Sequence, residues 1–472
     1  MKKTKIISSI GPSTQSWEKF KGIVEAGMNV ARINFSHATL EERKLDESLV
    51  ERANKELGTH VAILYDTKGP DLRTCTFEGD YIELVEGNTI RIVEEDLQDK
   101  GTKEQISFNY RNIVKDLKVG MTILVDDGFY KLIVEEVAAD GSSATCRIMN
   151  SGKIKSRRGV CIPGIKLDIP FVSDVDKKDI EYACNHDGDY LALSFVNSAD
   201  DIQEVKKLCT QYGKPNMKII SKVETQYAID NLKEIVRESD YIMIARGDLG
   251  IETGVENLPL YQQMMIDECH LQGKGVIMAT QMMSSMMHNI RPTNAEVTDV
   301  SNAVLQGCDA IMTSDETTIG EYPVETVQKM TDICEKVESY YHFENDIFDN
   351  TEKDITSIIA ESVVTASNDI GAKVIVAATM SGHTARKISN LRPIAPILAT
   401  VPNEKIATGL ALNYGVYPTI VKEYNSTDEV VNDGKEKAIE FAKLEKNDHI
   451  IITGGFPNTG NKITNFMKIE EI

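Results

Sequence analysis

The sequence has few cysteines, and none lies in a pattern that would cross-link or metallate a domain. Eight are scattered over 472 residues, without a C-x-x-C pair and without histidines at metal-ligand spacing. Disulfide frameworks are typical of small secreted chains, so we expect free, mostly buried thiols in a reducing cytoplasm. The apolar run near the N-terminus is too short for a signal peptide. No stretch approaches the ~18 apolar residues of a membrane helix.

Positive charge is also scarce. Lys and Arg total 52 against 73 Asp and Glu, which gives a formal net charge of −21. So acidic a surface repels nucleic acid and anionic membranes. If the protein binds phosphorylated ligands, its basic residues must therefore be concentrated locally. The remaining composition, 41% hydrophobic and 26% charged, excludes a disordered, collagen-like or fibrous protein.

Short apolar segments rich in β-forming residues alternate with longer segments whose apolar residues recur at helical spacing. Strands that alternate with helices imply a parallel sheet, and eight such units predict a closed (β/α)₈ barrel. The eight predicted strands are 5–10, 29–35, 61–66, 190–195, 218–223, 241–246, 275–280 and 310–314.

Two other stretches depart from this alternation. Residues 70–166 have β-hairpin character with Asp-Gly turns, which predicts a small β-barrel lid domain inserted in a βα loop. Removing it leaves 1–69 and 167–340, close to the ~250 residues typical of a barrel. From 341 to 472 strands and helices alternate again, which predicts a C-terminal α/β domain with an open sheet.

Polar side chains gather where the predicted barrel strands end, and active sites of such barrels lie at the C-terminal strand ends. Any one of these residues could be an ordinary structural polar group. Their convergence on one rim favours a functional site. The group consists of Arg32, Asn34, Ser36, His37, Asp66, Thr67, Lys68, Lys222, Glu224, Arg246, Gly247, Asp248, Thr280, Gln281, Ser314, Asp315 and Glu316.

Three of these residues point to metal-assisted chemistry. Glu224 and Asp248 follow adjacent strands, so their carboxylates could hold one Mg²⁺, which prefers a few carboxylates plus waters and substrate oxygens. Lys222 lies two residues before Glu224 and hence on the same strand face. A cation beside a divalent ion suits an oxygen that gains negative charge, such as an enolate or a transferring phosphoryl group. With Arg32 and Arg73 at the mouth, the residues predict phosphoryl or enolate chemistry on a small anion.

The chain resembles the pyruvate kinase family in six segments that occur in order. These are GMNVARINFSHA (27–38), DTKGPDLRT (66–74), SKVE (221–224), IMIARGDLG (242–250), IMATQM (277–282) and RPTNAEVTDVSNAV (291–304). The insertion point and the C-terminal domain also match, so the resemblance covers essentially the whole chain. It implies transfer of the phosphoryl group of phosphoenolpyruvate to ADP, giving pyruvate and ATP, the last step of glycolysis.

The resemblance also implies roles at the substrate end of the site. Lys222 would stabilise the phosphoryl group and the enolate oxygen. Glu224 and Asp248 would ligate a protein-bound Mg²⁺ (or Mn²⁺), and a second divalent ion would arrive with the nucleotide. The amides of Gly247 and Asp248, together with Thr280, would hold the substrate carboxylate. Arg32, Arg73, Lys222 and Thr280 are therefore the expected catalytic residues.

Nucleotide and monovalent-cation sites are implied in the same way. The lid would bring Asp127 and Arg158 over the site and exclude water that would otherwise hydrolyse the phosphoryl donor. Asp71 stands where K⁺-independent members of the family carry Lys. An acid there leaves a local negative potential that K⁺ can complement, so we expect K⁺ activation. The nucleotide would contact Arg32, Asn34, His37, Arg73 and Arg158, and K⁺ would be held by Asn34, Ser36, Asp66 and Thr67.

Several positions depart from the family pattern. Asp315 replaces a glycine, Ile319 a basic residue, Tyr227 an acid, and Asn294 an arginine. These changes concern nucleotide affinity and regulation more than the reaction. They motivate one alternative, a regulator that keeps the barrel without the activity, although the metal and substrate residues are all retained. A second alternative is another Mg²⁺-enolate barrel, such as a phosphoenolpyruvate mutase or an aldolase-like lyase, which the lid and C-terminal domain disfavour.

The C-terminal domain offers a candidate anion site after its first predicted strand. Hydroxyls and backbone N–H groups at a helix N-terminus bind anions, while ordinary capping by Ser381 or Thr384 is the simpler alternative. The segment resembles the sugar-phosphate pocket of allosteric pyruvate kinases, and 454–460 resembles its covering loop. Fructose 1,6-bisphosphate, a sugar monophosphate, and plain sulfate or phosphate all stay open as occupants, acting between subunits of an expected homotetramer. The site would comprise Thr379, Ser381, Gly382, His383 and Thr384.

Overall fold

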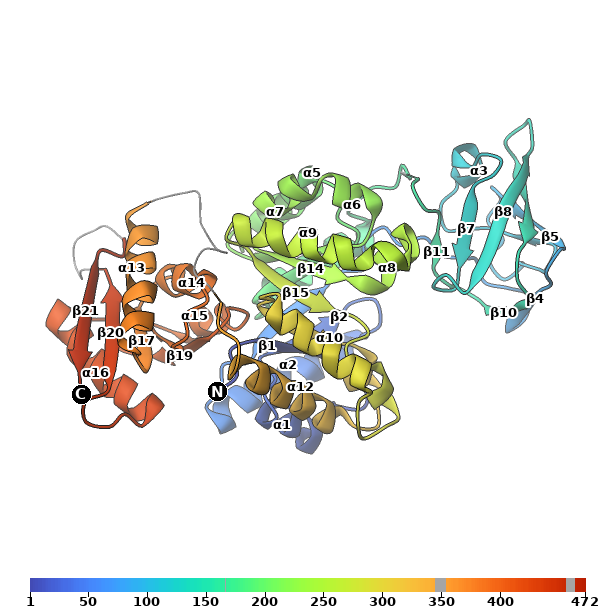
Figure 1. Ribbon diagram of the computed structural model, residues 1–472. Helices are drawn as coiled ribbons and strands as arrows, with labels where there is room; N and C mark the ends of the chain where they lie inside the picture. Colours follow the sequence, from blue (N-terminus) through green and yellow to red (C-terminus); the bar gives the residue numbers. More distant parts are fainter. Residues whose placement is uncertain (166, 344–353, 456–462) are drawn as a thin grey trace.

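The computed structural model describes residues 1–165, 167–343, 354–455 and 463–472. Three units lie in a row, with the inserted β domain at one end, the barrel in the middle and the C-terminal domain at the other end (Figure 1). The predicted fold class is confirmed: a closed parallel barrel, a curled β-sheet domain inserted in it, and an open-sheet α/β domain. The domain limits given above stay a prediction.

Eight parallel strands close the central barrel. Their order around it is β1-β16-β15-β14-β13-β12-β3-β2. The register pairs Asn34 with Asp66 and Lys222 with Met243, so the polar residues that follow the strands meet at one rim. The strands are β1 (Lys5–Ser9), β2 (Val30–Asn34), β3 (Ala62–Asp66), β12 (Tyr190–Leu193), β13 (Lys218–Val223), β14 (Tyr241–Ala245), β15 (Gly275–Ala279) and β16 (Ala310–Thr313).

Helices surround the barrel and bury their apolar faces against the strands. Several of them begin with a local signal: Thr39, Ser173, Ser198 and Thr293 each form a capping box with the acid three residues later, which satisfies backbone N–H groups at the helix start. The helices are α1 (Trp17–Glu25), α2 (Leu40–Leu57), α4 (Asp174–Asn185), α5 (Ala199–Gln211), α6 (Gln226–Asp230), α7 (Leu232–Glu238), α8 (Arg246–Thr253), α9 (Leu258–Leu271), α10 (Asn294–Leu305), α11 (Asp315–Thr318) and α12 (Pro323–Glu338), with 3₁₀ turns η1 (Val255–Asn257) and η2 (Ser284–Met287).

The inserted domain leaves the barrel after β3 and returns before α4. A six-stranded sheet of order β11-β7-β8-β9-β5-β6 and a two-stranded sheet β10-β4 enclose its own apolar core. Its elements are β4 (Tyr81–Leu84), β5 (Thr89–Val93), β6 (Gln105–Ile106), α3 (Ile113–Asp116), β7 (Thr122–Val125), β8 (Tyr130–Val137), β9 (Ser143–Ile148), β10 (Gly152–Lys155) and β11 (Val160–Cys161).

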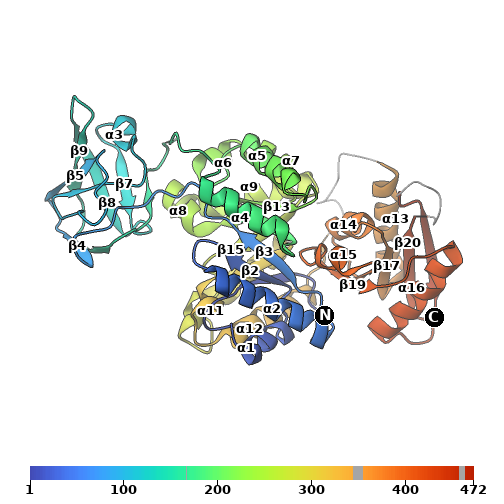
Figure 2. The same cartoon turned by 180° about the vertical axis from the view of Figure 1, so that it is seen from behind.

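The C-terminal domain packs on the side of the barrel opposite the inserted domain (Figure 2). Its sheet order is β19-β18-β17-β20-β21, with only β21 antiparallel among these strands. Its elements are α13 (Ile355–Ile370), β17 (Val374–Ala378), α14 (His383–Asn390), β18 (Ile397–Val401), α15 (Glu404–Thr408), β19 (Val416–Ile420), α16 (Thr427–Ala442), β20 (His449–Gly454) and β21 (Phe466–Glu471).

Contacts between the C-terminal domain and the barrel form at the N-terminal ends of the barrel strands. Leu412 belongs to the same buried apolar cluster as residues of the barrel interior. Arg392 forms a bidentate ion pair with Asp309, and Lys405 Nζ lies 2.7 Å from Asp189 Oδ1. The C-terminal domain therefore closes the end of the barrel opposite the polar rim.

All eight cysteines are free thiols as expected, and seven of them are buried, Cys161 being partly exposed. Among the helices that the structure describes, none is both long and apolar enough to cross a bilayer.

Candidate active site

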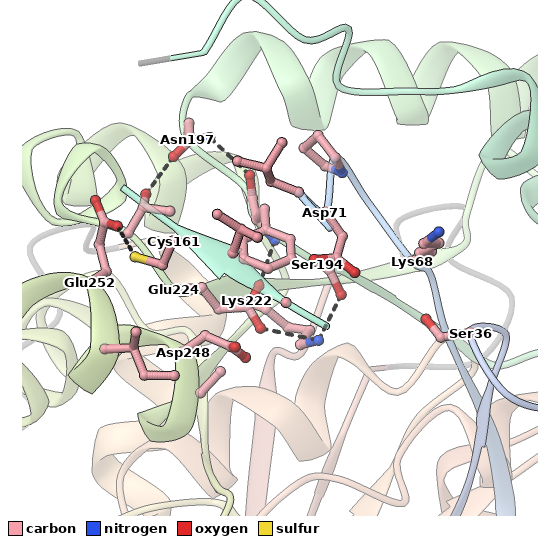
Figure 3. Close-up of a pocket in the computed structure, with 18 of the residues that line it drawn as sticks. Ser36, Lys68, Asp71, Cys161, Ser194, Asn197, Lys222, Glu224, Asp248 and Glu252 are labelled. Carbon is pink, nitrogen blue, oxygen red and sulfur yellow. Dashed lines mark hydrogen bonds and ion pairs between the residues drawn. The ribbon is translucent and has the colours of Figure 1, made fainter. Parts of the chain in front are cut away.

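A pocket of about 470 Å³ lies at the rim formed by the carboxyl ends of the barrel strands, between the barrel and the inserted domain. Its wall combines barrel residues with Asp71, Arg73, Asp127 and Cys161 of the insertion. Asp71 and Cys161 are labelled in Figure 3. Most of the residues singled out from the sequence line this one cavity. Those that do so are Arg32, Asn34, Ser36, His37, Lys68, Asp71, Arg73, Asp127, Lys222, Glu224, Tyr227, Asp248, Thr280 and Ser314.

Lys222 lies at the centre of the polar floor. Its Nζ is 3.2 Å from Glu224 Oε1 and 3.4 Å from Asp66 Oδ1, and it donates a 2.6 Å hydrogen bond to Ser194 Oγ (Figure 3). The side chain is 13% exposed. The ammonium group is thus held between two carboxylates, with one side open to the pocket.

The charges of this floor depend on one another. Burial alone would lower the pKa of Lys222, but Asp66 and Glu224 outweigh burial and raise it, so the ammonium stays protonated. Burial would raise the pKa of Asp66, but Lys222 and Arg32 reverse this and hold it below its usual value. Burial raises the pKa of Glu224, with Lys222 opposing the change and Asp248 adding to it.

Asp248 faces the pocket from the first turn of α8. Burial raises the pKa of its carboxyl, Lys222 opposes this change, and the nearby acids Asp127 and Asp71 add to it. Two neighbouring buried carboxyls whose pKa values are both raised mark a position where a divalent cation would remove the repulsion. Glu224 and Asp248 therefore fit Mg²⁺, which takes oxygen ligands and keeps several waters. No cluster of three His, Cys, Asp or Glu suited to a metal occurs in the described ranges.

Strand β15 ends in a backbone arrangement that is unusual for its residues. Thr280 and Gln281 have φ angles of +65° and +54°, a left-handed conformation that is unfavourable for non-glycine residues. The Thr280 hydroxyl accepts a 3.0 Å hydrogen bond from the Gly247 N–H and donates one to Ala279 O at 2.7 Å. A Cβ at Gly247 would meet no neighbouring atom closer than 3.9 Å, so packing alone does not require glycine there.

The residues expected to hold K⁺ come together between β2 and β3. Arg32 donates to Asp66 Oδ2 at 2.7 Å and to Ser9 Oγ at 2.7 Å, so its guanidinium is fixed within the barrel. Asn34 Oδ1 accepts from the Ser36 N–H at 3.0 Å. Of the four expected ligands Asp66 and Thr67 are buried, Asn34 is half-buried and Ser36 is exposed.

The inserted domain contributes charged residues that are paired among themselves. Arg73 Nε contacts Asp71, which offsets the negative charge that we expected Asp71 to leave for a cation. Arg158 is 3.3 Å from Asp126 and is not among the pocket-lining residues, although Asp127 is. The structure therefore brings Arg73 to the pocket and leaves Arg158 beside it.

Comparisons with known proteins agree along the whole chain. The profile for "Pyruvate kinase, barrel domain" matches residues 1–327, and that for "Pyruvate kinase, alpha/beta domain" matches 357–470. The chain is 38% identical to a pyruvate kinase of Clostridium acetobutylicum, with all of both chains covered. It is 39% identical to one of Staphylococcus saprophyticus, with 99% of this chain and 80% of the relative covered.

This chain belongs to the pyruvate kinase family. A solved pyruvate kinase from Cryptosporidium parvum superposes with a TM-score of 0.92 at 35% identity, covering all of this chain and 96% of the other. The resemblance inferred from the six sequence segments is thereby confirmed.

In the described structure, none of the four positions that depart from the pyruvate kinase pattern lies in the polar floor of the pocket. Tyr227 lines the wall. Asp315, Ile319 and Asn294 are exposed, Ile319 to 59%. None of the four contacts Lys222 through a hydrogen bond or ion pair in the described part of the chain.

Sequence reasoning missed the turn after β12, where Ser194 contacts Lys222 and the Phe195 N–H donates to Glu224 at 2.6 Å. The predicted strand 190–195 ended in these two residues, but a serine and an aromatic residue carry no charge signal. Sequence reasoning also missed Glu252 of α8, whose carboxylate accepts from Cys161 Sγ at 2.9 Å and from the Gly164 N–H at 3.1 Å. This contact ties the inserted domain to the barrel beside the pocket.

The residues of the expected effector site lie in the C-terminal domain, away from the pocket. Gly382 caps α14 with φ +79°, and in the described structure no side chain caps that helix. Thr384 Oγ1 instead lies 2.7 Å from Thr464 Oγ1. Burial and the cations Arg386 and Lys387 lower the pKa of His383. Most of the expected covering loop, 454–460, lies outside the described residues.

Proposed function

We propose that this chain carries out the pyruvate kinase reaction in the pocket described above, transferring the phosphoryl group of phosphoenolpyruvate to ADP to give pyruvate and ATP. One observation supports this choice most strongly. The Lys222 ammonium stays charged and open to the pocket, directly beside the acid pair Glu224 and Asp248. A fixed positive charge next to a divalent-cation site suits a reaction that leaves an enolate oxygen and moves a phosphoryl group.

We assign the metal to the acid pair. Glu224 and Asp248 would hold Mg²⁺ (or Mn²⁺), and when bound this ion would neutralise the negative charge of the phosphoryl and enolate oxygens. Lys222 would stabilise the enolate oxygen as the bond to phosphorus breaks. The amides of Gly247 and Asp248 and the Thr280 hydroxyl would orient the substrate carboxylate, which would take the Gly247 N–H that Thr280 accepts in this structure.

The phosphates are assigned to the basic residues of the two facing domains. Arg32 is locked by Asp66 and Ser9, and it would present a fixed charge to the transferring group. Arg73 would reach the phosphates from the lid side. Arg158, His37 and Asn34 would contact the nucleotide, and movement of the lid would exclude water from the phosphoryl donor.

The direct test of this function is a coupled assay. The purified chain, with phosphoenolpyruvate, ADP, Mg²⁺ and K⁺, should form ATP and pyruvate, which lactate dehydrogenase reduces with loss of NADH absorbance. Chelation of the divalent ion should stop the reaction, and pyruvate added directly should still be consumed as a control on the coupling enzyme. No turnover at saturating substrate, with or without sugar phosphates, would favour the regulator that keeps only the barrel.

We further propose that Asn34, Ser36, Asp66 and Thr67 hold K⁺. The supporting observation is that Asn34 lies opposite Asp66 in the register of β2 and β3, with Thr67 next in the chain, so their oxygen atoms lie at one rim. Replacing K⁺ by a bulky organic cation should lower kcat strongly. Equal kcat in both salts would reject this site.

An effector site, a homotetramer and a cytoplasmic location complete the proposal. We place the anion site at Thr379, Ser381, Gly382, His383 and Thr384. In the described residues no side chain caps α14, which supports this site over ordinary helix capping. Sugar phosphates should shift the half-saturating phosphoenolpyruvate concentration, and the Thr379→Ala/Ser381→Ala/Thr384→Ala variant should not respond. If no sugar phosphate shifts the phosphoenolpyruvate saturation curve of the wild type, the effector site is rejected and these residues only begin helix α14. Sedimentation of the purified chain tests the tetramer.

A further inference from the structure

The turn that follows β12 contacts both of the charged side chains on β13 that the proposed reaction uses. Ser194 is 3% exposed, and its Oγ lies 2.6 Å from Lys222 Nζ. The next residue, Phe195, donates its N–H to Glu224 Oε2 at 2.6 Å. Figure 3 shows the Ser194 and Glu224 side chains on either side of the Lys222 ammonium group.

The direction of the Ser194 hydrogen bonds follows from its partners. A serine hydroxyl has one proton to donate and lone pairs to accept with. Ser194 Oγ is 2.7 Å from the carbonyl oxygen of Thr67 and 3.4 Å from Asp66 Oδ1, and both of these can only accept, so the hydroxyl donates to the nearer one, Thr67. Its lone pairs then accept from the Lys222 ammonium. The hydroxyl thereby connects the backbone after β3 to the reacting group on β13.

Among the described residues Lys222 Nζ has three polar partners, and the contact with Ser194 is the shortest. The distances to Glu224 and Asp66 are 3.2 and 3.4 Å. Both carboxylates attract the ammonium group, but each has another partner: Asp66 pairs with Arg32, and we assign Glu224 to the metal. Attraction between charges depends weakly on direction, whereas a short hydrogen bond fixes distance and angle. Ser194 is thus the neutral contact that sets where the ammonium lies.

Phe195 adopts a backbone conformation that is costly for its residue type. Its φ angle is +57°, in the left-handed region that is unfavourable for non-glycine residues. Such conformations persist when the surrounding structure determines them, and they cluster at functional sites. In this conformation the Phe195 N–H points at Glu224, so the strain coincides with a hydrogen bond to a residue of the site.

We propose that the Ser194–Phe195 turn is the positioning element of this active site: the Ser194 hydroxyl fixes the Lys222 ammonium, and the Phe195 amide fixes the Glu224 carboxylate. The proposal rests on the proposed function, because it assigns the turn to phosphoryl transfer. A displacement of about 1 Å in a reacting group can cost about 10²-fold in rate. Loss of the groups that orient metal ligands typically costs about 10–100-fold.

The test is Ser194→Ala, with Ser221→Ala as its matched control. Ser221 is also buried and directly precedes Lys222, but its hydroxyl pairs with Ser239 Oγ at 2.7 Å. We expect Ser194→Ala to lower kcat about 10–100-fold while the phosphoenolpyruvate dissociation constant, measured by calorimetry without ADP, stays within about two-fold. Ser221→Ala should keep kcat near wild type, and Ser194→Thr, which retains the hydroxyl, should recover most of the rate.

The outcomes separate positioning from packing. A kcat for Ser194→Ala within about two-fold of wild type would overturn the proposal, and so would an equal loss in Ser221→Ala. A fall in melting temperature with parallel losses of kcat and substrate binding would assign Ser194 to the fold instead. If Ser194→Thr does not fold, the comparison of the two alanine variants still decides. Absence of turnover in the wild type would reject the proposed function itself, independently of Ser194.

Discussion

Removing one partner of the buried ion pair between Asp309 and Arg392 should be among the most destabilising single changes where the C-terminal domain meets the barrel. Arg392 Nη1 and Nη2 donate to Asp309 Oδ1 and Oδ2 at 2.7 and 2.9 Å, and Nη2 also donates to Gly307 O at 2.8 Å. The side chains are 2% and 1% exposed. The perturbation that we consider is Asp309→Asn, which keeps the shape and removes the charge.

The expected magnitude follows from this burial. A surface pair would contribute ~1 kcal/mol or less, but removing one partner of a buried pair leaves a charge that water cannot reach, which costs about 3–5 kcal/mol. Arg392→Met should cost a similar amount, because among the described residues it leaves the Asp309 carboxylate with one hydrogen bond, from the Val276 N–H at 2.9 Å. The double variant Asp309→Asn/Arg392→Met buries no charge and should lie within about 2 kcal/mol of wild type.

Urea unfolding followed by tryptophan fluorescence measures these values, since Trp17 is the single tryptophan and lies on the barrel helix α1. Activity at saturating substrate should change little, because the pair lies at the barrel end opposite the pocket. The reasoning would be refuted if either single variant cost less than about 1 kcal/mol, the range of an exposed pair. It would equally be refuted if the two single losses simply added in the double variant.

Three further predictions concern other contacts. Burial lowers the pKa of Lys5 to about 7, so between pH 7 and about 10 the unfolded chain binds more protons than the folded one, and the free energy of unfolding should rise with pH by at most about 1.4 kcal/mol per unit. Lys5→Met should flatten the rise in melting temperature between about pH 7 and 9, and an unchanged slope would contradict this prediction. Leu412→Ala truncates a buried side chain in the apolar cluster of the barrel interior, so it should lower the free energy of unfolding, measured by thermal unfolding, by about 2–5 kcal/mol. Leu260→Ala should not, because the Leu260 side chain is 68% exposed. Glu252→Ala should speed hydrogen exchange of the Gly164 amide, because it removes the carboxylate to which that N–H donates. Unchanged exchange would contradict a role for this contact in holding the lid.

The fold was accessible from the sequence because its signals are local. Each barrel strand is a short apolar run between helical segments, and the structure has strands in all eight predicted ranges. The β-hairpin character of the insertion and the restart of the alternation after it were equally readable. Polar residues at strand ends then predicted the floor of the site, since parallel strands bring their carboxyl ends to one rim.

What the sequence did not reveal depends on contacts between distant segments. Ser194 is an ordinary residue at a strand end until its hydroxyl is seen between Thr67 and Lys222. Asp71 read as an uncompensated negative charge, but the structure pairs it with Arg73. Hydrogen-bond partners of this kind depend on how the inserted domain and the strands pack, which neither periodicity nor residue spacing encodes.

The central claim is that a positively charged Lys222 stabilises the enolate and phosphoryl oxygens in the pyruvate kinase reaction of this chain. The most direct measurement is kcat of Lys222→Met beside the calorimetric affinity of the same variant for phosphoenolpyruvate. An interaction made mainly in the transition state should affect rate far more than binding. We predict a loss of several powers of ten in kcat with nearly unchanged substrate affinity. A variant that keeps wild-type kcat, or that loses only its substrate affinity, would contradict the account.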